Sequence, residues 1–185
     1  MKNILFLILI ILLSCNDKRY IRKYSLPKIK DVQFSENNKV NTQSQEFTWE
    51  VPSKWIEGVK SSLRIASYKV PYSDGFGDLS ISHFQGDGGG LVANINRWRK
   101  QIDLENQTLD QIRKNAIYGQ SYIGEYKMFK IVNNNNPSIA FLCSIISTKN
   151  STIFIKLNVT VKGINELEEE FKKFTSTFRY LNNEK

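Results

Sequence analysis

Two adjoining stretches near the carboxyl end of the chain differ in the spacing of their apolar residues. Apolar and polar side chains alternate over residues 152–161, which places the apolar ones on one face of a β-strand. The apolar residues that follow recur every three or four positions, at Ile164, Leu167, Phe171, Phe174 and Phe178. This second spacing places them on one face of an α-helix. The chain must therefore pack a half-buried sheet against an amphipathic helix.

Shorter patterns upstream fit the same architecture. Strands are predicted over residues 47–55 (stopped by Pro52), 61–70, 77–85, 117–132 (interrupted by Gly119 and Gly124) and 139–147, the last forming a hairpin with residues 152–161. Helices are predicted over residues 91–102, 108–114 and 164–178, the last with Asn165 and Glu168 as a capping pair. The order of strands, helix, strands and helix predicts an α+β domain, with an antiparallel or mixed central sheet and helices packed on it.

The first fifteen residues have the layout of an export signal. Lys2 precedes an apolar run over residues 4–13, which is shorter than the about 20 apolar residues of a membrane-spanning helix. Leu-Leu-Ser-Cys follows at residues 12–15 and resembles the lipobox of bacterial lipoproteins. The resemblance implies that the Cys15 thiol receives a diacylglyceryl group, that cleavage precedes Cys15, and that the new amino terminus is acylated, for example with palmitate. The alternatives are an ordinary signal peptide and a chance cysteine.

This interpretation divides the chain into three parts. We expect a signal peptide over residues 1–14, a lipid-anchored polar tether over residues 15–45 and a single folded domain over residues 46–185. The protein is then held on a membrane of the bacterial cell envelope and faces the periplasm or the cell surface. Cys143 is left without a disulfide partner, and its apolar neighbours predict a buried, inert thiol.

The chain carries a formal net charge of +8, which favours anionic partners. Export argues against nucleic acid, so the expected partners are the membrane, an envelope protein or a small anionic ligand. Alternatively, the excess of lysine only follows a composition rich in Asn, Ile and Lys. One histidine and no cysteine pair give too few ligands for zinc, and the aspartates near glycines lack EF-hand spacing. We therefore predict no metal site and no cofactor.

Two segments resemble known proteins. The residues that carry the first resemblance are Trp49, Val51, Pro52 and Trp55 at the start of the domain and Phe171, Phe174, Phe178 and Arg179 at its end. Together they resemble the PsbP-like superfamily, which implies an α/β/α sandwich and a non-catalytic role. Residues 86–101, GDGGGLVANINRWRKQ, are similar to a motif of uncharacterised bacterial exported proteins and lipoproteins.

The candidate ligand-binding residues lie in that second segment. They are Gly86, Asp87, Gly88, Gly89, Gly90, Asn94, Arg97 and Arg99. A glycine-rich loop that opens a helix exposes backbone N–H groups that can bind an anion, and arginine pairs well with carboxylate or phosphate. Asp87 would repel an anion or cap the helix. The alternatives are a tight turn that brings the helix onto the sheet, and Asn and Arg side chains that bond the loop's own carbonyls.

No catalytic residue is assigned from the sequence. His83 is the sole histidine, and alternation places it on the apolar face of its strand, as a core residue. Two further functions stay open: an envelope hydrolase that uses His83 with Asp78 or Asp87, and a purely structural envelope protein. The leading interpretation is a non-enzymatic binding module that uses the loop and helix over residues 86–99.

Overall fold

The structure, a computed structural model, describes residues 47–181. The predicted signal peptide (1–14), Cys15, the tether (15–45) and the last four residues lie outside this range. Within residues 47–181, no helix combines the length and apolar character needed to cross a bilayer.

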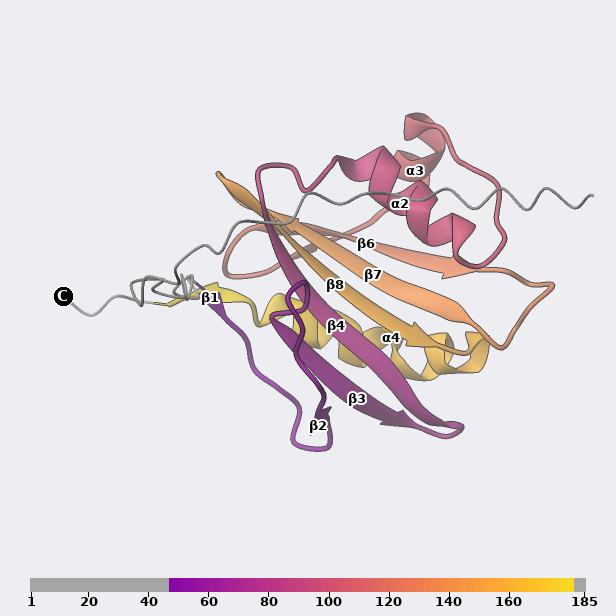
Figure 1. The fold of residues 1–185 in the computed structure, drawn as a ribbon, viewed down its shortest axis with the longest axis horizontal. Coiled ribbons are helices and arrows are strands. Elements are labelled where there is room, and N and C mark those ends of the chain that lie inside the picture. Colours follow the sequence, from indigo (N-terminus) through magenta and orange to yellow (C-terminus); the bar gives the residue numbers. More distant parts are fainter. Residues whose placement is uncertain (1–46, 182–185) are drawn as a thin grey trace, which may run out of the picture. The chain divides into compact units, whose positions relative to one another are not determined.

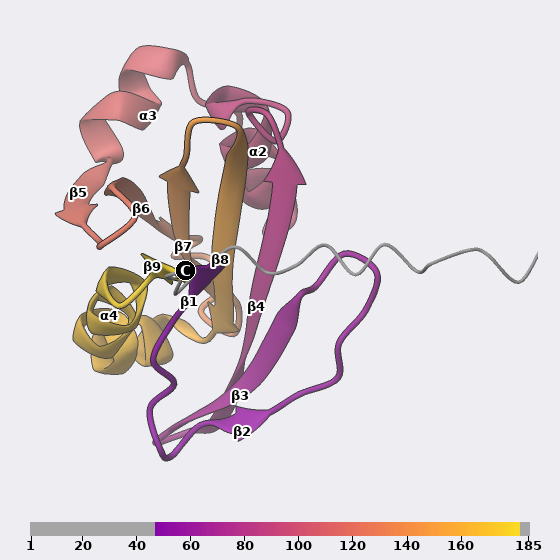
Figure 2. The ribbon, with the colours of Figure 1, turned by 90° about the vertical axis from the view of Figure 1, so that its left-hand side faces the viewer.

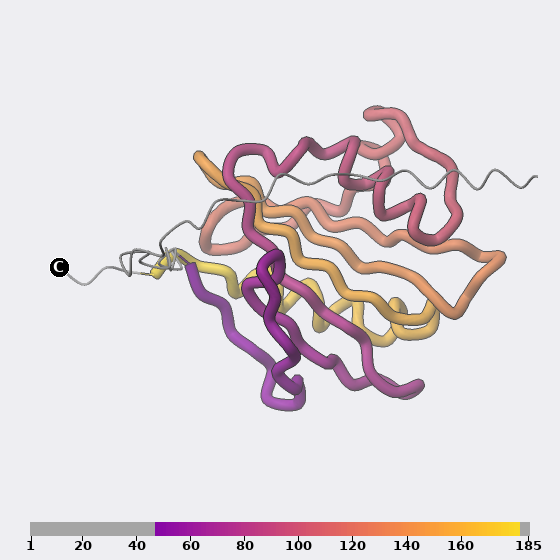
Figure 3. The backbone as a smooth tube through the Cα atoms, in the orientation of Figure 1, coloured from indigo at the N-terminus to yellow at the C-terminus, as the bar shows by residue number. Residues whose placement is uncertain are grey.

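A seven-stranded antiparallel sheet forms the centre of the domain (Figure 1). Its strands are β2 (Ile56–Glu57), β3 (Ala66–Tyr72), β4 (Gly75–Gln85), β5 (Ile117–Gln120), β6 (Glu125–Val132), β7 (Ala140–Ser147) and β8 (Ser151–Val159). They are ordered β2-β3-β4-β8-β7-β6-β5, so the last strand of the sheet is its central one. Figure 3 follows the backbone from β6 through β7 to β8, which lies beside β4. A separate pair joins β1 (Phe47–Thr48) to β9 (Arg179–Tyr180).

Three helices cover the two faces of the sheet. Helix α4 (Val161–Ser176) packs on one face, while α2 (Leu91–Lys100) and α3 (Leu109–Asn115) pack on the other (Figure 2). Because side chains alternate along β8, Ile153 and Ile155 join the core under α4, and Phe154 joins the core under α2. The predicted fold class, an α+β domain with an antiparallel sheet and helices packed on it, is confirmed.

The predicted hairpin and amphipathic helix at the carboxyl end of the chain are confirmed, but the predicted cap of that helix is wrong. Strands β7 and β8 form the predicted hairpin, and Phe171, Phe174 and Phe178 are buried in the core under α4. The helix begins earlier than predicted, however, and its cap is Thr160, whose hydroxyl accepts from the amide of Gly163 at 3.1 Å. Asn165 and Glu168 therefore lie inside the helix and cannot cap it.

Three strand predictions need correction. Over residues 47–55 only Phe47–Thr48 forms a strand, because Pro52 cannot donate to a ladder and its carbonyl accepts from the Trp55 amide in a turn. Residues 61–64 form a turn, closed by hydrogen bonds between Ser61 and Arg64, so β3 begins only at Ala66. The strand predicted over residues 117–132 is two antiparallel strands, β5 and β6, and the chain reverses where Ser121 and Gly124 bond each other's backbone. The reversal coincides with Gly124, whose φ of 154° favours glycine.

Candidate functional site

The glycine-rich loop over residues 86–90 joins β4 to α2. Gly86, Gly88, Gly89 and Gly90 all have positive φ angles, between 60° and 90°, a region that other residues rarely occupy. The loop is also held to the edge of the β7–β8 hairpin, because the Gly86 amide donates to Asn150 and its carbonyl accepts from the Thr152 hydroxyl at 2.8 Å. The run of glycines therefore provides a fixed, left-handed path into the helix.

Asn94, in the first turns of α2, fixes the shape of this loop. Its side-chain nitrogen donates to the carbonyl oxygens of Gly88, at 3.0 Å, and Gly90, at 2.7 Å. Its side-chain oxygen accepts from Nη2 of Arg97 at 2.6 Å, and the residue is only 2% exposed. For Asn94 the structure thus shows the alternative in which the side chain bonds the loop's own carbonyls. Arg97 stays exposed on the helix surface.

Asp87 does not cap α2. Its Oδ1 accepts from the Gly89 amide at 2.9 Å, within the loop, and the cap residue of the helix is Gly90, which makes no side-chain capping bond. One carboxylate oxygen of Asp87 is therefore engaged in holding the turn.

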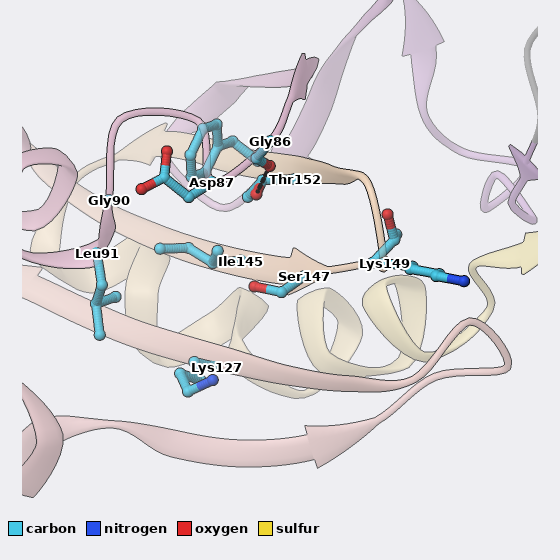
Figure 4. Close-up of a pocket in the computed structure, with 11 residues that line it drawn as sticks. Gly86, Asp87, Gly90, Leu91, Lys127, Ile145, Ser147, Lys149 and Thr152 are labelled. Atoms are coloured by element: carbon cyan, nitrogen blue, oxygen red, sulfur yellow. Dashed lines mark hydrogen bonds between the residues drawn. The ribbon is translucent and has the colours of Figure 1, made fainter.

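A pocket of about 430 Å³ lies beside the loop on the α2 side of the sheet (Figure 4). Gly86, Asp87 and Gly90 line it from the loop, and Leu91 lines it from the start of α2. The residues that line it from the sheet and the β7–β8 turn are Lys127, Ile145, Ser147, Thr148, Lys149, Thr152 and Phe154. The pocket thus combines an apolar floor with two lysines and a ring of small polar groups.

The charges at this pocket are mostly positive. Lys149 is exposed on the β7–β8 turn, and Lys127 is half-buried on β6, where its amine lies 3.8 Å from the Glu125 carboxylate. Asp87 is the only acidic residue that lines the pocket. Sequence reasoning missed both lysines, because a lone lysine on a strand or turn carries no local signal of a site.

Arg99 lies away from the pocket. Its Nε donates to the Glu105 carbonyl at 2.7 Å, so it fixes the segment between α2 and α3, and burial lowers the pKa of its guanidinium. Asn96 acts beside it through two hydrogen bonds to the backbone of Gln107, at 2.8 and 2.9 Å. Of the predicted residues, the structure places Gly86, Asp87 and Gly90 at the pocket, Gly88, Gly89 and Asn94 in the loop or bonded to it, Arg97 on the exposed surface of α2 bonded to Asn94, and Arg99 at the opposite end of the helix.

His83 and its proposed acidic partners lie on different faces of the sheet. The His83 ring packs edge-on against Phe47, with ring centroids 5.0 Å apart, on the α4 face. Asp78 points to the other face, where it pairs with Arg64, and Asp87 lines the pocket on that same face. The structure therefore does not bring together the pair on which a hydrolase would depend, and His83 is half-buried at the edge of the core, against Phe47.

Cys143 is fully buried beneath α2 and is a free thiol. Burial raises the pKa of this thiol well above its ordinary value, and only the nearby Lys156 acts in the opposite direction. Over residues 47–181, no three His, Cys, Asp or Glu side chains gather as they would around a metal ion.

Two solved structures are similar to this chain. One is the solution structure of cyanobacterial PsbP (CyanoP) from Synechocystis sp. PCC 6803, with 16% sequence identity and a TM-score of 0.47, covering 74% of this chain and 87% of that chain. The other is a crystal structure of a protein from Bacteroides thetaiotaomicron, with 16% identity and a TM-score of 0.45. The match covers 76% of this chain and 47% of that chain, about half of its length. No family model and no curated protein matches the chain.

Proposed function

We propose that this protein is a lipoprotein of the bacterial cell envelope whose folded domain is a non-enzymatic binding module for a small anionic ligand. The apolar run over residues 4–13 and the Leu-Leu-Ser-Cys sequence that ends at Cys15 support the lipid anchor. The polar residues 16–45 then connect the anchor to the domain.

The observation that carries the binding function is the pocket beside the glycine-rich loop. Lys127 and Lys149 bring two positive charges to it, Lys127 is also paired with Glu125 at 3.8 Å outside the lining, and Asp87 already uses an oxygen within its own turn. Ile145 and Phe154 supply an apolar floor. A concave apolar surface with a few convergent polar groups is typical of small-molecule sites. The first amides of α2 add a favourable potential for a negative charge.

The geometry also supports a non-enzymatic role. Nucleophilic catalysis needs a nucleophile and a base within hydrogen-bond reach, with the base oriented by a third group. His83 is separated by the sheet from Asp78 and Asp87, and the fully buried Cys143, whose thiol pKa is raised by that burial, lacks the partly exposed setting of a reactive thiol.

The lipid anchor is tested on the full chain produced in a bacterium. Mass spectrometry of the mature protein is expected to find Cys15 as its first residue, carrying a diacylglyceryl group and an amino-terminal fatty acid. The Cys15→Ala variant is expected to lose both modifications and to accumulate uncleaved. A mature amino terminus at any other residue, or one without lipid, would exclude this anchor.

The pocket is tested by nuclear magnetic resonance of the full chain in neutral detergent micelles. Citrate, glucuronate and inorganic phosphate serve as probes, each titrated at constant ionic strength against chloride. A ligand of the pocket is expected to shift the amide resonances of residues 86–91. Lys127→Gln is expected to weaken the affinity obtained from that titration at least tenfold. Lys173→Gln, an equal charge change on α4 at the opposite face, is the matched control. If none of the probes moves these amides, the pocket is not an anion site.

A further inference from the structure

We propose a second anion-binding site, for a phosphate group, in the corner between α2 and the exposed part of the sheet formed by β4 and β8. The residues that form this site, the Lys156 corner, are Arg64, Asp78, Arg97, Gln101 and Lys156. The inference goes beyond the proposed function, because none of these residues lines the pocket beside the glycine-rich loop.

Lys156, on the central strand β8, is a partly buried lysine at the centre of this corner. Its side chain is partly buried, with Nζ 3.7 Å from the centroid of the Phe141 ring, and it donates to the side-chain oxygen of Gln101. Gln101 is neutral, and no ion pair joins Lys156 to a carboxylate of residues 47–181. An ammonium group withdrawn from water in this way lacks the opposite charge that normally accompanies burial.

Two guanidinium groups lie near this ammonium. Arg97 precedes Gln101 by four residues, so both side chains lie on the same flank of α2. Arg64 comes from the turn before β3, and its Nη1 lies 3.1 Å from each oxygen of Asp78. Asp78 is two positions along β4 from Ser80, which is paired with Lys156 across the sheet. Asp78, the one carboxylic acid within residues 47–181 that acts on Lys156, is therefore already bonded to one of the arginines.

The Lys156 corner has an excess of positive charge, which favours binding of an anion. Burial lowers the pKa of Lys156, and the positive charges of Arg97 and Arg64 lower it further, while Cys143 and Asp78 act in the opposite direction. Three cations against one carboxylate leave a net charge of about two, by simple counting of ionised groups. Phosphate suits such a site, since its several oxygens can accept from an arginine fork and a lysine at once.

The Lys156 corner and the pocket lie at opposite ends of α2. The pocket contacts Leu91, the first residue of the helix, whereas Gln101 follows its last residue. Ten helical residues span roughly 15 Å. Figure 1 shows β4 and β8 side by side along this length, so one sheet face supports both sites. Along β8, however, Phe154 of the pocket is only two positions from Lys156, so the amides at the two ends of α2, residues 86–91 and Gln101, distinguish occupation of one site from occupation of the other.

The experiment titrates the full chain, in neutral detergent micelles, with inorganic phosphate and with glycerol 3-phosphate at constant ionic strength. Vesicles of phosphatidylglycerol, with phosphatidylcholine vesicles as reference, provide the same phosphate chemistry on a lipid. Amide shifts at Ser80, Gln101 and Lys156 with the soluble phosphates indicate a free phosphate ligand. Binding to phosphatidylglycerol alone, reduced by changes in this corner, indicates a lipid headgroup. If neither source affects these residues, or if the shifts are confined to residues 86–91, the proposal is wrong.

Substitutions separate this site from general charge effects. Lys156→Met and Arg64→Gln are each expected to weaken phosphate binding at least tenfold, and the exposed Arg64 gives a variant that does not disturb the core. Lys173→Gln and Lys127→Gln change the charge by the same amount elsewhere and are expected to leave binding in this corner unchanged. Wild-type affinity in both Lys156→Met and Arg64→Gln would overturn the proposal. If Lys127→Gln loses ligand binding at the pocket but keeps phosphate binding in the Lys156 corner, the two sites bind their ligands independently.

Discussion

The side-chain amide of Asn94 donates to the carbonyl oxygen of Gly90 at 2.7 Å, so a residue in the first turns of α2 bonds the residue that precedes the helix. The same nitrogen reaches Gly88 at 3.0 Å. A single buried side chain thus satisfies two carbonyls of a loop whose glycines would otherwise have wide conformational freedom. The shape of the pocket wall depends on this contact.

We expect Asn94→Ala to lower the free energy of unfolding by about 1–3 kcal/mol, because it removes the side-chain bonds to the Gly88 carbonyl and to Arg97, while the Gly90 carbonyl keeps its bond from the backbone amide of residue 94. Denaturant unfolding measures the loss, and amide hydrogen exchange is expected to accelerate over residues 86–90. Asn94→Asp is the matched control, since it keeps the acceptor for Arg97 and removes both donors. If Asn94→Ala is as stable as the wild type, the side-chain bonds to the glycines contribute nothing.

Gly86 and Gly88 have nearly the same φ, 64° and 60°, but different surroundings. A Cβ added at Gly86 meets no atom within 4 Å, whereas one added at Gly88 lies 2.7 Å from Cε2 of Phe154. We expect Gly86→Ala to cost about 1–2 kcal/mol from backbone strain alone. Gly88→Ala is expected to cost about 1–3 kcal/mol more, because Phe154 is held in the core. Equal losses for the two variants, measured by denaturant unfolding, would contradict the close approach of Gly88 to the sheet.

The elements that the sequence predicted well are those with a local repeating pattern. Alternation over β8 and the three-and-four spacing of α4 each reflect one buried face, so the type of element follows without knowledge of its partners. The β5–β6 reversal was missed because residues 117–132 read as one β-prone run, and only the pairing of Tyr126 with Gly119 reveals two strands.

The candidate site was harder to predict, for a physical reason. The pocket joins the glycine-rich loop to Lys127, Ile145 and Lys149, and this meeting depends on the order and register of β6, β7 and β8. No local pattern encodes that order. Arg99 illustrates the converse, because its nearness in sequence to Asn94 suggested one site, while the helix carries it to the Glu105 carbonyl at the other end.

A substitution of His83 tests whether this histidine only packs against its neighbours. Its Nε2 is buried and has no hydrogen-bond partner within the described part of the chain, and its ring packs against Phe47. Replacing an unsatisfied buried polar group by an apolar one of similar size is neutral or stabilising. We therefore expect His83→Phe to change the free energy of unfolding by less than about 1 kcal/mol, or to raise it, and to leave ligand binding intact. A loss of more than about 2 kcal/mol would show that the ring nitrogen has a partner that matters.

Because of Cys143, we expect the domain to lose stability at alkaline pH. Burial raises the pKa of this thiol in the folded protein, whereas in the unfolded chain it ionises near its ordinary value of 9.0. Above that pH the unfolded state binds fewer protons than the folded state, so the free energy of unfolding falls as the pH rises. For one such group the loss between pH 7 and pH 10 is about 1.4 kcal/mol.

Denaturant unfolding of the wild type and of Cys143→Ala across this range measures the effect. The variant loses some stability at every pH because it leaves a small cavity, but the alkaline loss assigned to the thiol is expected to disappear. Burial lowers the pKa of the neighbouring Lys156, so its titration changes stability in the opposite direction, and it is present in both proteins. The difference between the two curves therefore reports the ionisation of Cys143 together with its electrostatic coupling to Lys156. Parallel curves from pH 7 to pH 10 would mean that this thiol ionises as readily in the folded protein as in the unfolded chain.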